Sequence, residues 1–314
     1  MNAAASPYIL IVGAGAIGAL YGSALSRQGA RVAVVCRSEY EVVKRDGYAI
    51  RSPLLGDHVF RPHAVFRNVA ECTEHPDYLL LTSKVLPDVD RAALIRPAVH
   101  ANTTIVLIQN GIDIEADVAD AFASNELLSS LAFVQVGRGQ PGQVNHQAFG
   151  WLLMGNYPSG ITPAAERIAA LFKASGVECK LTDDPASARW QKAVWNTTFN
   201  PLSILGGVLD TAQMLRTERD RMFVRDVMQE VCDVAAAAGH PQSPKLIDSL
   251  IGNTHAAPGY KTSMALDYEN RRPMEIEAIL GNVVRAGRKL HVAVPKLETI
   301  YAVAQMVAAA RDDR

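Results

Sequence analysis

The chain has 314 residues, of which 49% are hydrophobic and 20% are charged, and its formal net charge is -1 at pH 7. This balance is typical of a globular protein large enough for two domains, and a net charge near zero argues against nucleic acid as a partner. No stretch reaches the roughly 18 consecutive apolar residues that a membrane span needs, so we expect no membrane partner.

The four cysteines are far apart and form no Cys-x-x-Cys pair, so the sequence predicts neither a zinc site nor a compact disulfide framework. The first residues lack the basic region and the long apolar region of a signal peptide. We expect a cytoplasmic protein without a metal, either a monomer or a homodimer.

The first half of the chain has the pattern of a parallel α/β sheet. An apolar run at 8–12, a helical pattern at 19–28 and a β-branched run at 31–35 predict one βαβ unit. Further apolar runs at 78–82 and 104–108 are continuous rather than alternating, which is typical of parallel strands covered on both faces. These elements predict a doubly wound sheet.

The pattern then changes twice along the chain. Residues 127–154 predict a hairpin attached to the sheet, and an amphipathic helix at 163–174 is expected to return to that sheet. Beyond these elements helical patterns dominate to the end. We therefore predict an α/β Rossmann-like, doubly wound N-terminal domain at 1–185, followed by an all-α C-terminal domain at 186–314.

A glycine-rich turn separates the first predicted strand from its helix. Its residues are Gly13, Ala14, Gly15, Ala16, Ile17 and Gly18. In this G-x-G-x-x-G arrangement Gly13 can make the tight turn, Gly15 lets the backbone approach a pyrophosphate, and Gly18 allows the helix to pack closely on the sheet. The pattern predicts a dinucleotide site; the alternative is a glycine-rich turn that binds nothing.

The residue after the second strand indicates which dinucleotide is bound. NAD sites usually have Asp or Glu there to bind the ribose hydroxyls, whereas this chain has Arg37. A guanidinium can donate charge-assisted hydrogen bonds to a 2′-phosphate, so we expect NADP(H). The alternative is that Arg37 is an ordinary surface arginine.

Ligands of such sheets bind beyond the carboxyl ends of the strands. This rule directs attention to Lys84 after the third predicted strand and to Asn110 after the fourth. Lys84 could equally be a solvated loop lysine, and Asn110-Gly111 could be a turn dipeptide. Both loops should face the cofactor, and for Asn110 the alternative to a turn dipeptide is a contact with cofactor and substrate; the residues alone leave both choices open.

The helical half contains a polar ridge. Lys192, Asn196 and Asn200 recur at i, i+4 and i+8, which places them along roughly 12 Å of one helix face. Trp195 and Phe199 border this ridge and are poor choices for a fully solvated surface. The pattern favours the wall of a cleft, with an exposed polar stripe or a buried asparagine pair as the alternatives.

Pro273 predicts the start of a later helix and places Glu275 in its first turn. The helix dipole favours a carboxylate at that position whatever the function of the protein. Spacing alone therefore does not identify Glu275 as a catalytic residue.

From Ile9 to about Val303 the chain resembles the ketopantoate reductase (2-dehydropantoate 2-reductase) family. The resemblance lies in a set of motifs that occur together and in order. They are the Gly13 to Gly18 turn, Arg37, Thr82-Ser-Lys84, Gln109-Asn110-Gly111, Lys192-x3-Asn196-x3-Asn200-Pro201, Thr262-Ser263-Met264-x2-Asp267, Glu275-Ile276 and His291-Val-Ala-Val-Pro295.

The resemblance implies NADPH-dependent reduction of 2-dehydropantoate to pantoate, a step of pantothenate and coenzyme A biosynthesis. Hydride transfer to a 2-keto carbon leaves alkoxide charge, which a nearby ammonium can stabilise and protonate. The catalytic residues implied by the family are Lys192, as general acid, and Glu275, which also binds the distal hydroxyl of the substrate. The implied substrate ligands are Asn110, Asn196 and Asn200, with Ser263 for the substrate carboxylate, and the implied cofactor contacts are Lys84, Asn110 and Glu275.

Some questions stay open at the level of sequence. The loop Ser83-Lys84-Val85-Leu86 is less polar after the lysine than the family pattern, so the substrate could be another branched or hydroxylated 2-keto acid. A non-enzymatic NADP(H)-sensing protein is the third alternative, and the presence of both Lys192 and Glu275 argues against it. Burial would lower the pKa of Lys192 and Glu275 would raise it, and the sequence does not decide between them.

Overall fold

The structure is a computed structural model that describes residues 6–312. These residues form two compact units. The first unit contains residues 6–84, 89–109 and 115–185. The second unit contains residues 85–88, 110–114 and 186–312. The helical second unit therefore includes two short segments from loops of the first half of the chain, which a single boundary at residue 185 does not anticipate.

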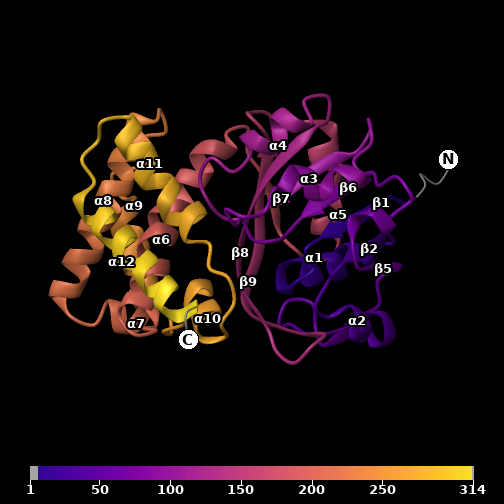
Figure 1. Ribbon diagram of the computed structural model, residues 1–314, viewed down its shortest axis with the longest axis horizontal. Helices are drawn as coiled ribbons and strands as arrows, with labels where there is room; N and C mark the ends of the chain where they lie inside the picture. The colour runs from indigo at the N-terminus through magenta and orange to yellow at the C-terminus, as the bar shows by residue number, and fades with distance from the viewer. Residues whose placement is uncertain (1–5, 313–314) are drawn as a thin grey trace. The chain divides into compact units, whose positions relative to one another are not determined.

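The first unit is built on one sheet of ten strands (Figure 1). The strands are β1 (Tyr8–Val12), β2 (Arg31–Val35), β3 (Tyr48–Arg51), β4 (His58–Phe60), β5 (Ala64–Phe66), β6 (Tyr78–Leu81), β7 (Thr104–Ile108), β8 (Leu127–Arg138), β9 (Gln143–Asn156) and β10 (Cys179–Leu181). Their order is β4-β3-β9-β8-β7-β6-β1-β2-β5, with β10 beside β9. The pairs from β5 through β8 are parallel, and β8 and β9 form an antiparallel hairpin.

Helices cover both faces of this sheet. They are α1 (Ala16–Ser26), α2 (Tyr40–Asp46), α3 (Arg91–Ile95), α4 (Ala116–Ala121) and α5 (Pro163–Ala174), with short 3-10 helices at Val69–Glu71 and Arg96–Ala98. Ile9 and Ile11 of β1 lie in a core cluster with residues of α1 and α5, whereas Leu10 lies in a second cluster with residues of α3 and α4. Each central strand is therefore buried on both sides, which is why its sequence is continuously apolar. The predicted doubly wound α/β fold is confirmed.

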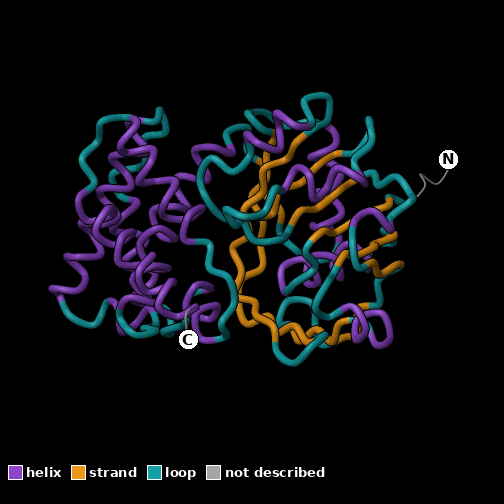
Figure 2. The backbone as a smooth tube through the Cα atoms, in the orientation of Figure 1, coloured by secondary structure: helices purple, strands orange, loops and turns teal. Residues whose placement is uncertain are grey.

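The second unit consists of helices joined by loops (Figure 2). They are α6 (Pro185–Leu205), α7 (Thr211–Met214), α8 (Glu218–Ala237), α9 (Leu246–Ala256), α10 (Ser263–Glu269), the π-helix η3 (Glu277–Gly281), α11 (Asn282–Lys289) and α12 (Pro295–Asp312). Their apolar faces share one core that includes Phe199, Val231 and Leu280, each fully buried. Within residues 186–312 no strand forms, as predicted. None of the helices in the described part of the chain is both long and apolar enough to span a bilayer.

The helix predicted to begin at Pro273 begins instead after Glu275. The backbone carbonyl of Glu275 accepts the first helical hydrogen bond, from the Ile279 amide at 3.0 Å. The carbonyl of Arg272 accepts a hydrogen bond from the Arg311 guanidinium at 2.8 Å. This carbonyl therefore does not begin the helix, and residues 273–275 lie outside it. Glu275 therefore occupies the N-terminus of the helix and not its first turn.

This helix opens with a π-helical segment, η3, because two of its carbonyls have partners elsewhere. The Ala278 carbonyl accepts from the Ile112 amide at 3.2 Å, and the Ile279 carbonyl accepts from the Thr197 hydroxyl at 2.7 Å. Groups that insert into the helical ladder in this way distort it. Segments of π-helix are frequent at functional sites, and this one directly follows Glu275.

Candidate functional site

The three glycines of the turn between β1 and α1 differ in whether the protein has room for a larger side chain at their positions. Gly13 has φ +86°, and a Cβ added to it would lie 2.6 Å from the Ser83 amide nitrogen. A Cβ on Gly18 would lie 2.6 Å from the Thr82 hydroxyl oxygen. A Cβ on Gly15 would meet nothing closer than 3.9 Å, so packing inside the protein does not require glycine there. A helix start with no side-chain cap, where an added Cβ would make only ordinary contacts, fits a pyrophosphate.

Replacing Gly15 with alanine should therefore weaken NADPH binding while leaving the free energy of unfolding within about 1 kcal/mol of wild type. The matched variant Gly13→Ala should lose roughly 1–3 kcal/mol of stability, because its methyl group would overlap the backbone of Ser83. Fluorescence titration with NADPH and thermal unfolding measure the two effects. Wild-type NADPH affinity in Gly15→Ala would contradict the fit of a pyrophosphate at this turn.

The loop after β2 contains two charges of opposite sign. Arg37 is exposed, and no hydrogen bond or ion pair of its side chain occurs within residues 6–312. Glu39 is only 8% exposed and lies 3.3 Å from the Arg138 guanidinium at the end of β8. The sequence pattern identified Arg37 but neither Glu39 nor Arg138, because nothing local links a loop after β2 to the end of a distant hairpin strand.

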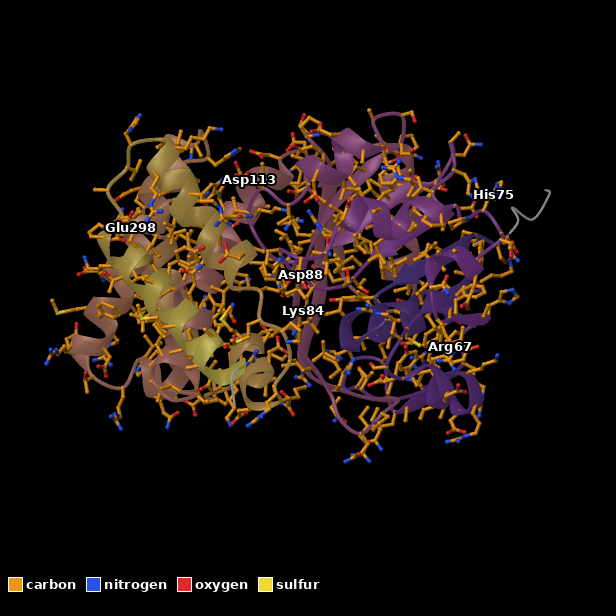
Figure 3. All side chains as sticks on the ribbon, in the orientation of Figure 1. Arg67, His75, Lys84, Asp88, Asp113 and Glu298 are labelled. Atoms are coloured by element: carbon orange, nitrogen blue, oxygen red, sulfur yellow. The ribbon has the colours of Figure 1, made fainter. Side chains whose placement is uncertain are left out.

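The loops after β6 and β7 are joined by the side chain of Gln109. Its amide nitrogen donates to the Ser83 carbonyl at 2.5 Å, and its amide oxygen accepts from the Arg91 guanidinium at 2.9 Å. Lys84, which follows Ser83, is partly buried in the loop after β6 (Figure 3). These bonds fix the carboxyl ends of two central strands beside Gly13, where the turn of the dinucleotide motif lies.

The segment that follows Gln109 belongs to the second unit and packs against η3. Gly111 has φ +115°, and a Cβ added to it would lie 2.8 Å from the Ala278 carbonyl oxygen, so glycine is required. Arg189 on α6 is 4% exposed and donates from its guanidinium to the Gly111 carbonyl at 3.3 Å. These contacts hold the neighbouring Asn110 in place against the helical unit.

Three side chains predicted separately meet in this unit. The Lys192 ammonium on α6 donates to the Asn110 amide oxygen at 2.9 Å. The Glu275 carboxylate accepts from the Val85 amide at 3.0 Å and is close enough to Lys192 to raise its pKa. The structure therefore brings an ammonium, an amide oxygen and a carboxylate together from a helix, a strand-end loop and the start of a later helix.

The surroundings of Lys192 lower its pKa. Burial is the largest cause, the charge of Arg189 acts in the same direction, and together they lower the pKa of Lys192 to about 7 despite the opposing effect of Glu275. Taking an ammonium out of water, and placing a second cation near it, both disfavour the protonated state. Lys192 is thus poised to release a proton near neutral pH, which is the property of an efficient general acid.

The rest of the polar ridge is not a solvated stripe. Asn200 is 2% exposed, and its amide oxygen accepts from the Ser263 hydroxyl at 3.4 Å, so these two predicted residues lie side by side. Asn196 is partly buried, and no hydrogen bond of its side chain is present in the described part of the chain. The rings of Trp195 and Phe199 lie 4.8 Å apart beside the ridge.

Arg189 is a residue of this cluster that the sequence pattern did not single out. It precedes Lys192 by one helical turn, so the spacing i, i+3 on α6 was the available signal. Its burial was not predictable, because arginines are usually exposed. The structure shows that it both supports the Asn110-Gly111 segment and lowers the pKa of Lys192.

Two sequence profiles from one protein family match this chain. A sequence profile described as "Ketopantoate reductase PanE/ApbA" matches residues 9–159. The profile described as "Ketopantoate reductase PanE/ApbA C terminal" matches residues 184–308. Together the two profiles match most of the chain.

Relatives of similar length extend over nearly the whole chain. A 2-dehydropantoate 2-reductase of Nostoc sp. is 28% identical over 93% of this chain and 92% of its own length. The crystal structure of a 2-dehydropantoate 2-reductase from Methylococcus capsulatus is 49% identical, with a TM-score of 0.90 and 97% of each chain covered. One from Geobacter metallireducens GS-15 is 33% identical, with a TM-score of 0.90, and 95% of this chain and 99% of that chain are covered.

The same fold also occurs in a D-mandelate dehydrogenase solved with NADH and anilino(oxo)acetate, which is 22% identical with a TM-score of 0.87. The fold thus occurs in proteins that are named for different substrates. The matched profiles and the relative that shares 49% of its residues show that the chain is an oxidoreductase and belongs to the ketopantoate reductase family.

Proposed function

We propose that this chain reduces 2-dehydropantoate to pantoate with NADPH, and that Lys192 is the general acid. The observation that supports this most strongly is the Lys192 ammonium, with its pKa lowered to about 7, bonded to Asn110 and close to Glu275. Several relatives named 2-dehydropantoate 2-reductase support the choice of substrate. The direct test is turnover of 2-dehydropantoate by the purified chain, with pantoate identified as the product.

NADPH, when bound, supplies the hydride for the keto carbon, and the chain supplies the proton for the keto oxygen. The hydrogen bond from the Lys192 ammonium to the Asn110 amide oxygen, 2.9 Å long, orients the ammonium. As negative charge develops on the keto oxygen, the ammonium stabilises it and then transfers a proton to it. Release of the proton also relieves the repulsion between Lys192 and Arg189.

The substrate is held by the polar groups that follow Lys192 along α6. Asn196 and Asn200 offer amide groups, and Ser263, exposed at the start of α10, can turn its one hydroxyl donor from Asn200 to the substrate carboxylate. Glu275 accepts a hydrogen bond from the Val85 amide, and because a carboxylate can accept several, the distal hydroxyl of the substrate is proposed as a further donor. The same residue, with Asn110 and Lys84, is proposed to contact the cofactor.

The proton on Lys192 fixes the expected pH dependence. Reduction needs the protonated lysine, so kcat/KM for the keto acid should be constant at low pH and fall about tenfold per pH unit above pH 7. Glu275 raises the pKa of Lys192, so Glu275→Gln should shift the fall to lower pH. Arg189 lowers that pKa, so Arg189→Met should shift the fall to higher pH. Shifts in the opposite directions, or no shift in either variant, would remove Lys192 from the proton-donor role.

Arg37 is proposed to set the preference for NADPH, because its exposed guanidinium follows β2 at the position where an NAD site has a carboxylate. Wild type should bind NADPH at least about 10-fold more tightly than NADH, since a hydrogen bond to a charged group is typically worth 1.5–3 kcal/mol. Arg37→Asp should remove most of this preference. Dissociation constants for the two coenzymes, measured by titration, check the result; equal wild-type affinities would rule out the role of Arg37.

A further inference from the structure

The hairpin of β8 and β9 is fixed at its tip against the segment that follows β2. The Ala49 amide on β3 donates to the Gly142 carbonyl at 2.8 Å, and Ala49 is also paired in register with Gln143 on β9. A Cβ added to Gly142 would lie 3.0 Å from a methyl carbon of Val42 on α2. The tip is therefore fixed beside α2 and β3, and these contacts also fix the backbone of Arg138 at the end of β8.

The guanidinium of Arg138 lies between the glycine-rich turn and the loop after β2. A Cβ built on Gly15 would be 4.0 Å from its Nη1 atom, and no side chain lies closer to that point. Its Nε atom is 3.3 Å from a carboxylate oxygen of Glu39, which directly precedes α2. The Nε side of the guanidinium thus pairs with an acid, and its Nη1 end lies next to Gly15.

The positive charge of Arg138 would allow an anion to bind close to Glu39. Glu39 lies two positions after Arg37 and is 8% exposed, so its carboxylate alone would repel a phosphate placed at this turn. Arg138 offsets that charge and uses one of its five N–H groups to do so, which leaves others for a second partner. Its side chain is 34% exposed, so a ligand can reach it.

We propose that Arg138 binds the pyrophosphate of the dinucleotide above Gly15, and that Glu39 is the positioning residue that holds the Arg138 guanidinium there. The proposal rests on the proposed use of NADP(H) by this chain. It separates the two arginines by role: Arg37 recognises the 2′-phosphate that only NADP(H) has, and Arg138 binds the phosphates that both coenzymes share.

Titration of NADPH and of NADH against the full-length protein tests the division of roles. Arg138→Ala should raise the dissociation constants of both coenzymes by the same factor, roughly 10-fold or more, as expected for the loss of charge-assisted hydrogen bonds. Arg37→Ala should raise the dissociation constant of NADPH alone. Arg45→Ala is the matched control, because Arg45 also pairs with a carboxylate, that of Asp46 at the end of α2, but the Arg45 side chain is 72% exposed. This control should bind both coenzymes as wild type does.

Replacing Glu39 in the Arg138→Ala variant provides a second test, in which coenzyme affinity should be regained. In Arg138→Ala the Glu39 charge is left unpaired, so Arg138→Ala with Glu39→Gln should bind NADPH and NADH more tightly than Arg138→Ala does. Thermal unfolding of each variant confirms that it is folded. Unchanged affinities in Arg138→Ala, a loss confined to NADPH, or no recovery in the double variant would overturn the proposal. A wild-type protein that binds NADPH no better than NADH would contradict the proposed coenzyme preference and leave Arg138 standing.

Discussion

Replacing Lys192 with alanine should lower kcat for 2-keto acid reduction by roughly 10²-fold or more while leaving the dissociation constant of NADPH close to that of wild type. General acid catalysis typically contributes 10²–10⁴-fold to a rate, and Lys192 is the ammonium that Asn110 holds at 2.9 Å with a pKa lowered to about 7. The residual activity should also lose the fall in rate above pH 7, because the group that titrates there is absent.

The control for this variant is the same substitution at a lysine that has no part in the site. Lys289, exposed in the last turn of α11, serves this purpose, and Lys289→Ala should retain the kcat and the pH profile of wild type. Single-turnover rates with saturating NADPH measure the effect without interference from product release. An unchanged kcat in Lys192→Ala would show that another group, or water, donates the proton.

Wild type should reject the 4-deoxy analogue of 2-dehydropantoate strongly, with kcat/KM lower by up to roughly 10⁴-fold, if Glu275 accepts a hydrogen bond from the 4-hydroxyl. A site built to bind a hydroxyl discriminates against a substrate that lacks it, because a buried polar group is then left unpaired. Glu275→Ala should lose most of this discrimination. The alternative role of Glu275 is to support the start of η3, and then its loss should cost only about 0.3–1 kcal/mol of stability and affect all keto acids alike.

Glu277 provides the matched carboxylate for this experiment. It lies in the first turn of the same helix, but it is paired with Arg285 at 2.7 Å and hydrogen-bonded to Tyr301. Glu277→Gln should therefore lower stability without changing the ratio of kcat/KM between the two keto acids. Equal wild-type activity on 2-dehydropantoate and its 4-deoxy analogue would remove Glu275 from substrate recognition.

The parts of the fold predicted from sequence are those with long, regular patterns. The runs at 8–12, 31–35 and 104–108 coincide with β1, β2 and β7, and the amphipathic helix at 163–174 coincides with α5. The strands β3, β4, β5 and β10 were not predicted; each has only three or four residues, too few to show a period, and they are specified by pairing with the sheet. The helix start at Pro273 was wrong because Arg311, distant in sequence, engages the Arg272 carbonyl.

The site could be predicted where local motifs define it and not where distant charges meet. The turn from Gly13 to Gly18 and the spacing of Lys192, Asn196 and Asn200 follow from local sequence, and Asn110 follows from its place after a buried strand. The pKa of Lys192 depends on the buried Arg189, which spacing alone does not reveal. The pair formed by Glu39 and Arg138 depends on the position of a hairpin tip, which is set by contacts with β3 and α2.

The activity proposed for this oxidoreductase is reduction of 2-dehydropantoate with NADPH. The measurement that tests it most directly is kcat/KM of the wild-type protein with NADPH for 2-dehydropantoate, its 4-deoxy analogue and a panel of other branched and hydroxylated 2-keto acids, with the product identified in each case. We expect 2-dehydropantoate to have the highest kcat/KM in the panel and to yield pantoate. A higher kcat/KM for another keto acid, or no consumption of NADPH with 2-dehydropantoate, would contradict the proposal.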